Sequence, residues 1–131
     1  MAKEKKGEET TSKPLGWLHG EIKTPPFTEE GRREAGYLLR LLQQGEKLGM
    51  PQAEPLPIVG PRCGALRVRD GGHNWRIMYR VDARRVLILD VYAKKTKTIP
   101  DKVIAQCKRR LKDYDDEVAR VRREQANHDN D

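Results

Sequence analysis

Basic side chains alternate with apolar ones in two short segments of the sequence. Arg67 and Arg69 lie two residues apart, and Arg76 and Arg80 lie four residues apart, in runs whose composition favours β-strands. Because successive side chains of a strand point to opposite faces, each pair of arginines shares one face of its strand. Guanidinium groups gathered on one face of adjacent strands would bind a phosphodiester through charge and forked hydrogen bonds.

Three lysines extend this pattern. Lys94, Lys95 and Lys97 directly follow the apolar run 86–92, so they would lie at the end of the next strand. Cleavage of RNA without a metal requires removal of the 2′-hydroxyl proton, protonation of the leaving oxygen and stabilisation of negative charge on phosphorus. Clustered cations supply the last of these. The alternative is that all these charges are solvent-facing side chains of an amphipathic sheet.

The positive charge is concentrated in one part of the chain. The net charge is +7, yet residues 62–112 alone carry fifteen Lys and Arg against four Asp and Glu. The segment before this stretch is balanced, and the segment after it is acidic. Such a distribution is typical of a surface that binds a polyanion such as a nucleic acid.

The sequence excludes several other function classes. It has no Gly-rich phosphate loop, no HExxH motif and no cysteine pair at metal-binding spacing, and its three histidines are scattered. We therefore expect no metal and no other cofactor. Two cysteines are too few for a secreted disulfide scaffold, and no apolar run approaches the roughly 18 residues of a membrane span. A cytoplasmic protein without a membrane segment is expected, with Cys107 as a core residue.

The elements that must position these side chains can be predicted from periodicity. Apolar residues at helical spacing predict one helix over residues 28–44 and a second that starts with a capping box at Thr98 and Asp101 and runs to about residue 122. Alternation predicts strands over 65–69, 75–81 and 86–92, and the short turns between them indicate an antiparallel meander. The last of these strands is apolar on both faces and is therefore expected in the middle of the sheet.

The remaining segments carry weaker signals. Trp17-Leu18-His19 would open a short strand, and the proline-rich segment 45–60 is expected to be a long ordered loop. Residues 1–14 and 124–131 have little to bury and are expected to be disordered tails. These boundaries leave a single domain over residues 15–123.

The motifs resemble those of the RelE/ParE toxin superfamily. Segment 65–69 reads ALRVR, segment 75–82 reads WRIMYRVD and segment 94–100 reads KKTKTIP. The last two are most similar to the phage-derived HigB-like branch, where a WRIxYRxD strand and a KKTxxTP motif precede a final helix; here Ile99 is inserted before the proline. The resemblance covers about residues 17–115, and the WRIMYRVD segment is its most specific part.

This resemblance implies an α+β, RelE-like fold. An N-terminal helix or helical hairpin and a C-terminal helix would pack on a small twisted antiparallel sheet. The implied activity is that of a type II toxin, a metal-independent endoribonuclease that cleaves mRNA at the ribosome and so inhibits translation. The implied partners are the ribosome, mRNA and a cognate antitoxin, expected to be a helix-turn-helix, HigA-like protein.

The resemblance also assigns roles to residues. By motif position, Arg67, Arg76 and Lys95 would contact the scissile phosphate. The further candidates for binding RNA are Arg69, Arg80, Lys94, Lys97, His73 and Tyr92. The catalytic tyrosine found near the C-terminus of RelE has no counterpart, because the matching stretch 98–101 reads TIPD; Tyr92 and His73 are the candidates to replace it.

Two other functions are compatible with the same motifs. A ParE-like protein would share the fold but poison gyrase through protein contacts, and the strand-face arginines disfavour this because they suit a phosphate better than a protein surface. A non-catalytic, phage-derived nucleic-acid-binding module would bind RNA in a salt-sensitive way without toxicity. The missing tyrosine keeps this last alternative open.

Overall fold

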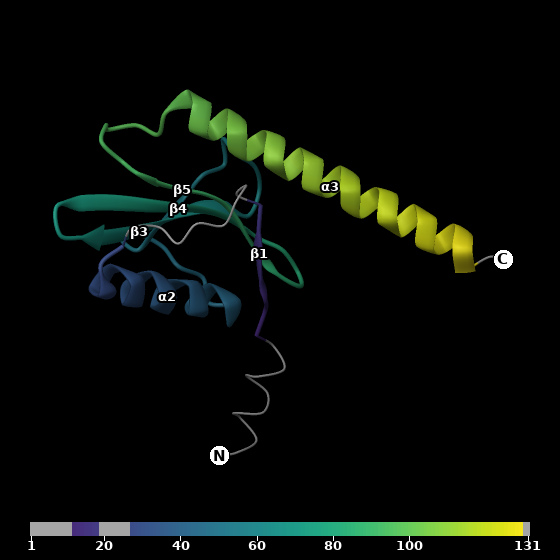
Figure 1. Ribbon diagram of the computed structural model, residues 1–131, viewed down its shortest axis with the longest axis horizontal. Coiled ribbons are helices and arrows are strands. Elements are labelled where there is room, and N and C mark those ends of the chain that lie inside the picture. Colours follow the sequence, from purple (N-terminus) through teal and green to yellow (C-terminus); the bar gives the residue numbers. More distant parts are fainter. Residues whose placement is uncertain (1–11, 19–26, 130–131) are drawn as a thin grey trace, which may run out of the picture.

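Five strands form one mixed sheet with a helix on each of its faces (Figure 1). The computed structural model describes residues 12–18 and 27–129. The elements, in chain order, are β1 (Leu15–Trp17), α2 (Glu29–Gln43), β2 (Ala53–Pro55), β3 (Cys63–Asp70), β4 (His73–Val81), β5 (Val86–Ala93) and α3 (Asp101–Asp129). The expected α+β fold, with one N-terminal and one C-terminal helix on a small sheet, is confirmed.

Helix α2 is tied to the sheet at its first turn. The Thr28 side chain accepts a hydrogen bond from the Gly31 N–H (3.2 Å), which caps the helix. The Thr28 N–H (2.8 Å) and hydroxyl both donate to the carboxylate of Asp70 at the end of β3. A Cβ at Gly31 would lie 2.5 Å from the Asp70 Cγ, so only glycine permits this approach. The same face of α2 continues as a buried stripe through Ala35, Leu38, Leu39 and Leu42.

Strands β3 and β4 form the predicted hairpin, slightly longer than expected. Their register runs from Cys63 opposite Arg80 to Asp70 opposite His73, and Gly71, with φ 62°, closes the turn. Strand β2 lies inside the segment predicted as a loop, and it pairs with β3 only up to Leu66. The Arg67 N–H still donates to the Gln52 carbonyl (2.8 Å). Beyond Arg67, the outer edge of β3 is open in the part of the chain that the structure describes.

The sheet is mixed and not wholly antiparallel. Strand β5 lies between β4 and β1, so the expected interior position is confirmed, although β4 is the central strand. Strand β1 pairs with β5 in parallel, from Leu15 opposite Val86 to Trp17 opposite Ile88. The short strand was predicted to start at Trp17; it ends there instead, and His19 lies outside the described residues.

Each face of the sheet has its own apolar core. Leu38 of α2 packs with Leu66 and Ile88 on one face. On the other face, Met78 and Leu87 pack with Cys107 of α3, which has no exposed surface. The prediction that Cys107 is a core residue is therefore confirmed.

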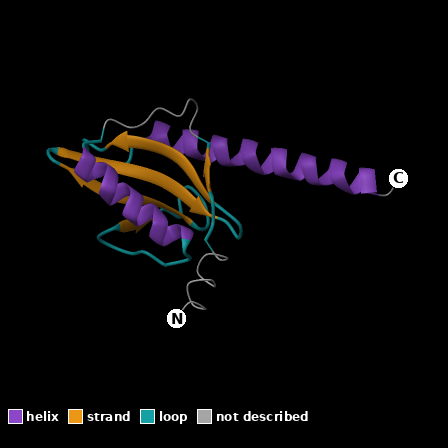
Figure 2. Ribbon diagram, turned by 60° about the horizontal axis from the view of Figure 1, so that its bottom comes forward, coloured by secondary structure: helices purple, strands orange, loops and turns teal. Residues whose placement is uncertain are grey.

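Helix α3 is longer than its buried stripe. It is buried at Val103, Cys107 and Leu111 and continues to Asp129, past the predicted end at about 122. Every described residue from Val121 onward is exposed, and Figures 1 and 2 show this half of the helix projecting beyond the sheet. Ion pairs along its own surface, such as that between Arg120 and Glu117, stabilise the projecting turns.

The N-terminal boundary also differs from the prediction. Of the expected tail 1–14, residues 1–11 lie outside the described part. The Lys13 N–H donates to the Gln43 carbonyl (2.8 Å), and the Gln43 side chain donates to the Lys13 carbonyl (2.7 Å).

Within the described residues, no helix is long and apolar enough to cross a membrane.

Candidate functional site

Arg67, Arg76 and Tyr92 form one row across three adjacent strands. Arg67 of β3 pairs with Arg76 of β4, and Arg76 pairs with Tyr92 of β5. Side chains of directly paired residues lie on the same face, with Cβ atoms about 4.5–5.5 Å apart. We call these three residues the arginine row. It lies on the same face of the sheet as α3, and Tyr92 packs against the core that this helix covers.

A β-bulge places Tyr92 in this row. The register shifts between Met78 and Tyr79, which pair with Asp90 and Ile88, so Leu89 is the extra residue on β5. Before the bulge, Val86 and Ile88 face α2; after it, the even-numbered Tyr92 faces the other way, beside Arg76. Without the extra residue, simple alternation would put the tyrosine on the α2 face.

Arg76 is a buried charge without a carboxylate partner. Only 5% of the surface of Arg76 is exposed. Its Nη1 donates a hydrogen bond to the Trp75 carbonyl (3.2 Å). Its Nε is buried without a hydrogen-bond partner, and no ion pair of Arg76 is found within the described residues. Burial lowers the pKa of Arg76, and the nearby charge of Arg67 lowers it further. Since buried charges are normally paired, the site is suited to an anionic ligand.

Tyr92 is a proton donor at neutral pH. Burial raises the pKa of Tyr92 to about 12, although the charge of Arg76 opposes this shift. The hydroxyl is buried and has no partner among the residues described. The Tyr92 hydroxyl and the Arg76 Nε are thus two buried donors that no described residue satisfies.

A second row of polar groups lies next to the first. Arg69 of β3 pairs with Asn74 of β4, and the Lys94 N–H donates to the Asn74 carbonyl (2.7 Å). By alternation, the Asn74 side chain shares the face of Arg76. The row of Arg69, Asn74 and Lys94 thus runs parallel to the arginine row, one step nearer to the β3–β4 turn.

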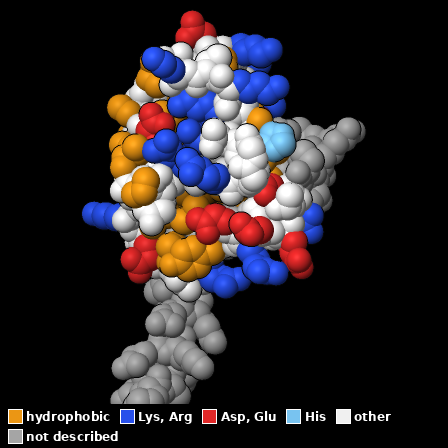
Figure 3. All heavy atoms as spheres, turned by 90° about the vertical axis from the view of Figure 1, so that its left-hand side faces the viewer, with side chains coloured by type: hydrophobic (Ala, Val, Ile, Leu, Met, Phe, Trp, Pro, Cys, Tyr) orange, Lys and Arg blue, Asp and Glu red, His pale blue; other side chains and the backbone are white. Residues whose placement is uncertain are grey.

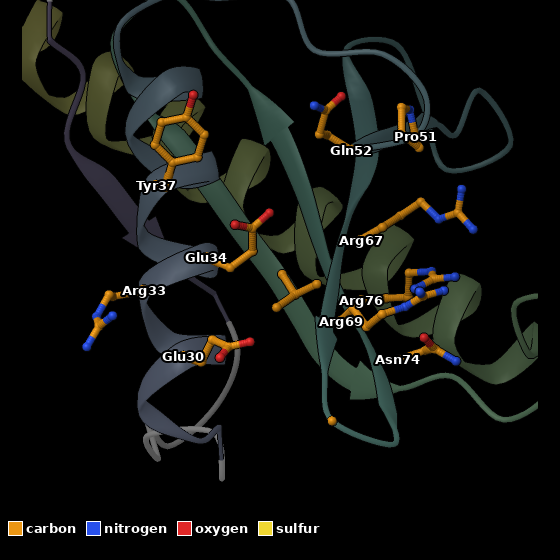
Figure 4. Close-up of a pocket in the computed structure, with 12 residues that line it drawn as sticks. Glu30, Arg33, Glu34, Tyr37, Pro51, Gln52, Arg67, Arg69, Asn74 and Arg76 are labelled. Atoms are coloured by element: carbon orange, nitrogen blue, oxygen red, sulfur yellow. The ribbon is translucent and has the colours of Figure 1, made fainter.

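A cleft of about 1020 Å³ runs along the open edge of β3 and is lined by members of both rows, but not by Tyr92 or Lys94 (Figure 4). One wall consists of Arg67, Arg69, Arg76 and Asn74, whose side chains extend away from α2. Pro51 and Gln52 close one end. The α2 wall lies on the other side of β3 and consists of Glu30, Arg33, Glu34 and Tyr37. Figure 3, which faces the β3–β4 turn, shows Lys and Arg side chains grouped above a band of Asp and Glu.

The chain that forms this cleft matches a known protein family. Residues 26–112, more than half of the chain, match the family described as phage derived protein Gp49-like (DUF891), a RelE/toxin-like family. The chain belongs to this Gp49-like family. No curated protein and no solved structure matches it.

Arg80 has a structural position in this Gp49-like protein. It shares the face of Arg76, but it lies at the far end of β4 beneath α3 and is 8% exposed. Its guanidinium donates to Asp82 (2.7 and 2.9 Å) and to Asp115 of α3 (3.0 and 2.8 Å). These hydrogen bonds raise the pKa of Arg80. Both carboxylates already occupy the guanidinium, so this geometry gives Arg80 a structural contact, and its expected contact with RNA stays a prediction.

The other predicted residues are distributed around the turn and the end of β5. His73 stacks on Trp75 (ring centroids 5.9 Å apart), and Trp75 packs edge-on against Phe27 (5.1 Å). His73 therefore lies on the α2 side, separated from Arg76 by the sheet. Lys95 and Lys97 are exposed in the segment between β5 and α3. Their proposed contacts with RNA stay predictions.

Several residues of the cleft were not predicted. Asn74 is the second residue of β4 and was predicted as part of the turn before it, and Gln52 lies in the turn before β2, so neither is marked by a periodic signal in the sequence. Glu30, Glu34 and Tyr37 follow one another at spacings of four and three, which places them on one face of α2. That spacing is visible in the sequence, but which neighbour the face opposes depends on the tertiary structure. Among the described residues, no group of three His, Cys, Asp or Glu is arranged to hold a metal ion.

Proposed function

We propose that this Gp49-like protein is the toxin of a type II toxin–antitoxin pair and inhibits translation by cleaving mRNA at the ribosome. The observation that carries the proposal is Arg76, a buried guanidinium with an unpaired Nε between Arg67 and Tyr92. A like-charged pair beside a buried hydroxyl is costly for folding, and a phosphate in the cleft would offset that cost. The relation of the family to RelE-like toxins supports the same function.

In the proposed reaction, the scissile phosphate lies against the arginine row. The 2′-oxygen bonds to phosphorus as its proton passes to solvent, and the bond from phosphorus to the 5′-oxygen breaks. Arg67 and Arg76 stabilise the extra negative charge on phosphorus. Tyr92 donates its proton to the leaving 5′-oxygen and is reprotonated from solvent. The products are a 2′,3′-cyclic phosphate and a 5′-hydroxyl. Lys94 and Lys95, which follow β5, add positive charge beside the bound RNA.

Cleavage on purified translating ribosomes tests this proposal. Wild-type protein should cut mRNA at discrete positions mapped by primer extension, and Arg76→Ala should lower the single-turnover rate by about 10²–10³-fold. Arg84→Ala is the matched control, because Arg84 is exposed in the turn between β4 and β5, outside the cleft. Arg76→Lys keeps the charge but loses the forked pair of guanidinium N–H donors. This variant should fold, and its single-turnover cleavage rate should remain at least about tenfold below that of wild type.

Other outcomes would point to another function. Intact mRNA together with defective DNA supercoiling in expressing cells would favour a ParE-like gyrase poison. Salt-sensitive RNA binding without cleavage or growth arrest would favour a nucleic-acid-binding module.

We further propose that a helix-turn-helix, HigA-like antitoxin neutralises the protein by covering the basic wall of the cleft. The test is co-expression with the product of the adjoining reading frame, which should restore growth and co-purify with the toxin. The double variant Arg67→Glu/Arg69→Glu should lose this association if the basic wall is the contact surface. Unchanged association would place the antitoxin elsewhere.

A further inference from the structure

The α2 wall of the cleft is acidic, although the opposite wall is basic. Glu30, Glu34 and Tyr37 share one face of α2, line the cleft and are exposed, with 57% of Tyr37 accessible. Figure 4 shows the carboxylates of Glu30 and Glu34 pointing from the helix toward β3. The cleft therefore passes around the edge of β3, with cations on the α3 face of the sheet and carboxylates on the α2 face.

Neither carboxylate is neutralised by the protein around it. Arg33 also lines the cleft, but it pairs with Glu29 (3.6 Å), and Figure 4 shows its guanidinium on the side of α2 away from β3. Glu30 and Glu34 form no ion pair and no side-chain hydrogen bond with residues 12–18 or 27–129. The same cleft is lined by Arg76, which is 5% exposed and has an unpaired Nε. Unpaired polar groups therefore occur on both sides of the β3 edge.

We propose that the α2 wall binds a guanine base of single-stranded RNA whose phosphate lies on the arginine row. This inference rests on the proposed function. A carboxylate only accepts hydrogen bonds, and it has two oxygens side by side. The Watson–Crick edge of guanine offers two adjacent donors, N1–H and the N2 amino group, which match this pair. Adenine, cytosine and uracil each place an acceptor next to a donor on that edge, so they fit a carboxylate less well.

The remaining features of the cleft agree with a nucleotide. Its volume of about 1020 Å³ lies at the upper limit of small-ligand pockets, roughly 300–1,000 Å³, and leaves room for a base together with its phosphate. The exposed ring of Tyr37 is available for stacking, which is how proteins hold unpaired bases of RNA. Glu30 and Glu34 lie one helical turn apart, so either can accept from a base stacked on that ring.

The alternative is that the two glutamates are merely a solvated helix face. In that case they repel RNA, and removing their charge would strengthen the binding of every sequence alike. If they bind guanine, removing their charge weakens only the sequences that contain it. The two interpretations therefore predict effects of opposite sign on the same variant.

Fluorescence anisotropy with short RNAs separates them. The probes are uridine-rich oligonucleotides of about six nucleotides with a single central G, A, C or U, and the full-length protein is used. We expect wild-type protein to bind the G probe about tenfold or more tightly than the U probe. Glu30→Gln/Glu34→Gln should reduce this ratio to about twofold or less, since an amide can replace only one of the two oxygens. Binding of the U probe should stay unchanged or become stronger.

The matched control is Glu29→Gln, because Glu29 lies on the same helix turn but outside the cleft and is paired with Arg33. It should keep the guanine preference. Equal affinity of wild-type protein for all four probes, or a uniform gain in the double variant, would overturn the inference. Ribosomal cleavage without base preference would leave the proposed function intact, whereas absence of RNA binding altogether would remove both. Tight binding of a peptide without RNA binding would assign the cleft to a protein partner.

Discussion

Arg67 and Arg76 stand directly opposite each other on β3 and β4, two like charges in a paired position. Like charges at such a position destabilise a sheet by about 0.2–1 kcal/mol. Neither forms an ion pair with a carboxylate in the part of the chain that the structure describes, and the Arg67 guanidinium contacts only the Met50 sulfur (3.7 Å). The pair is therefore strained by charge in the absence of a ligand.

Relief of this repulsion gives the first prediction. Arg67→Gln should raise the free energy of unfolding by up to about 0.5 kcal/mol, measured by urea denaturation at low salt. The same change should weaken RNA binding and lower the slope of log affinity against log salt by about 1. A stable variant whose RNA affinity is unaltered would show that Arg67 does not contact phosphate.

The second prediction concerns Tyr92. Tyr92→Phe removes a buried hydroxyl that has no partner, so stability should be unchanged or slightly higher. Single-turnover cleavage should fall by about 10²-fold or more, with RNA affinity altered by less than about threefold. Because the pKa of Tyr92 is raised to about 12, the hydroxyl should stay protonated and the wild-type rate should not decline through loss of this acid up to about pH 10. Full cleavage by the variant would eliminate Tyr92 as the proton donor.

Asp70 provides the third prediction. Hydrogen bonds from the Thr28 hydroxyl and N–H lower the pKa of Asp70 from its usual value of 3.8. A lowered folded-state pKa contributes stability that is present above 3.8 and is lost as the pH falls through the folded-state value. Asp70→Asn should therefore lower the Tm at pH 7, and this difference should shrink as the pH drops below about 4. Thermal melts from pH 7 to about pH 2.5 measure it; a difference independent of pH would show that charge is not involved.

The fourth prediction separates Arg80 from the arginine row. Arg80→Ala leaves Asp82 and Asp115 without their common partner and should destabilise the protein by about 2–4 kcal/mol, less than a fully buried pair because Asp115 is half exposed. At a temperature where the variant remains folded, its RNA affinity should stay within about twofold of wild type. Selective loss of RNA binding by a folded variant would return Arg80 to the binding surface.

The helices and the three long strands were predictable because their signals are local. Period-two alternation located Arg67 and Arg76 on one face, and the register confirmed that they are paired. Helical spacing located α2 to within a residue at each end. By contrast, the projecting end of α3 buries nothing, so no apolar periodicity marks it.

The rest of the site depends on tertiary structure. The bulge at Leu89 moves the Tyr92 side chain to the opposite face of the sheet, and no residue type in the sequence predicts this bulge. Arg80 follows the same alternation as Arg76, but Asp115, which occupies its guanidinium, comes 35 residues later from α3. The sequence could not show that one arginine of the strand is a structural anchor and that the other lacks a partner.

The contact between Thr28 and Asp70 fixes the width of the cleft. It joins the start of α2, next to Glu30, to the end of β3, next to Arg69, so the two walls form one rigid frame. A cleft of fixed width selects its ligand by size and cannot close around it as a hinged pair of domains would. Any conformational adjustment must therefore come from the ligand, which favours a flexible single strand of nucleic acid over a stiff duplex.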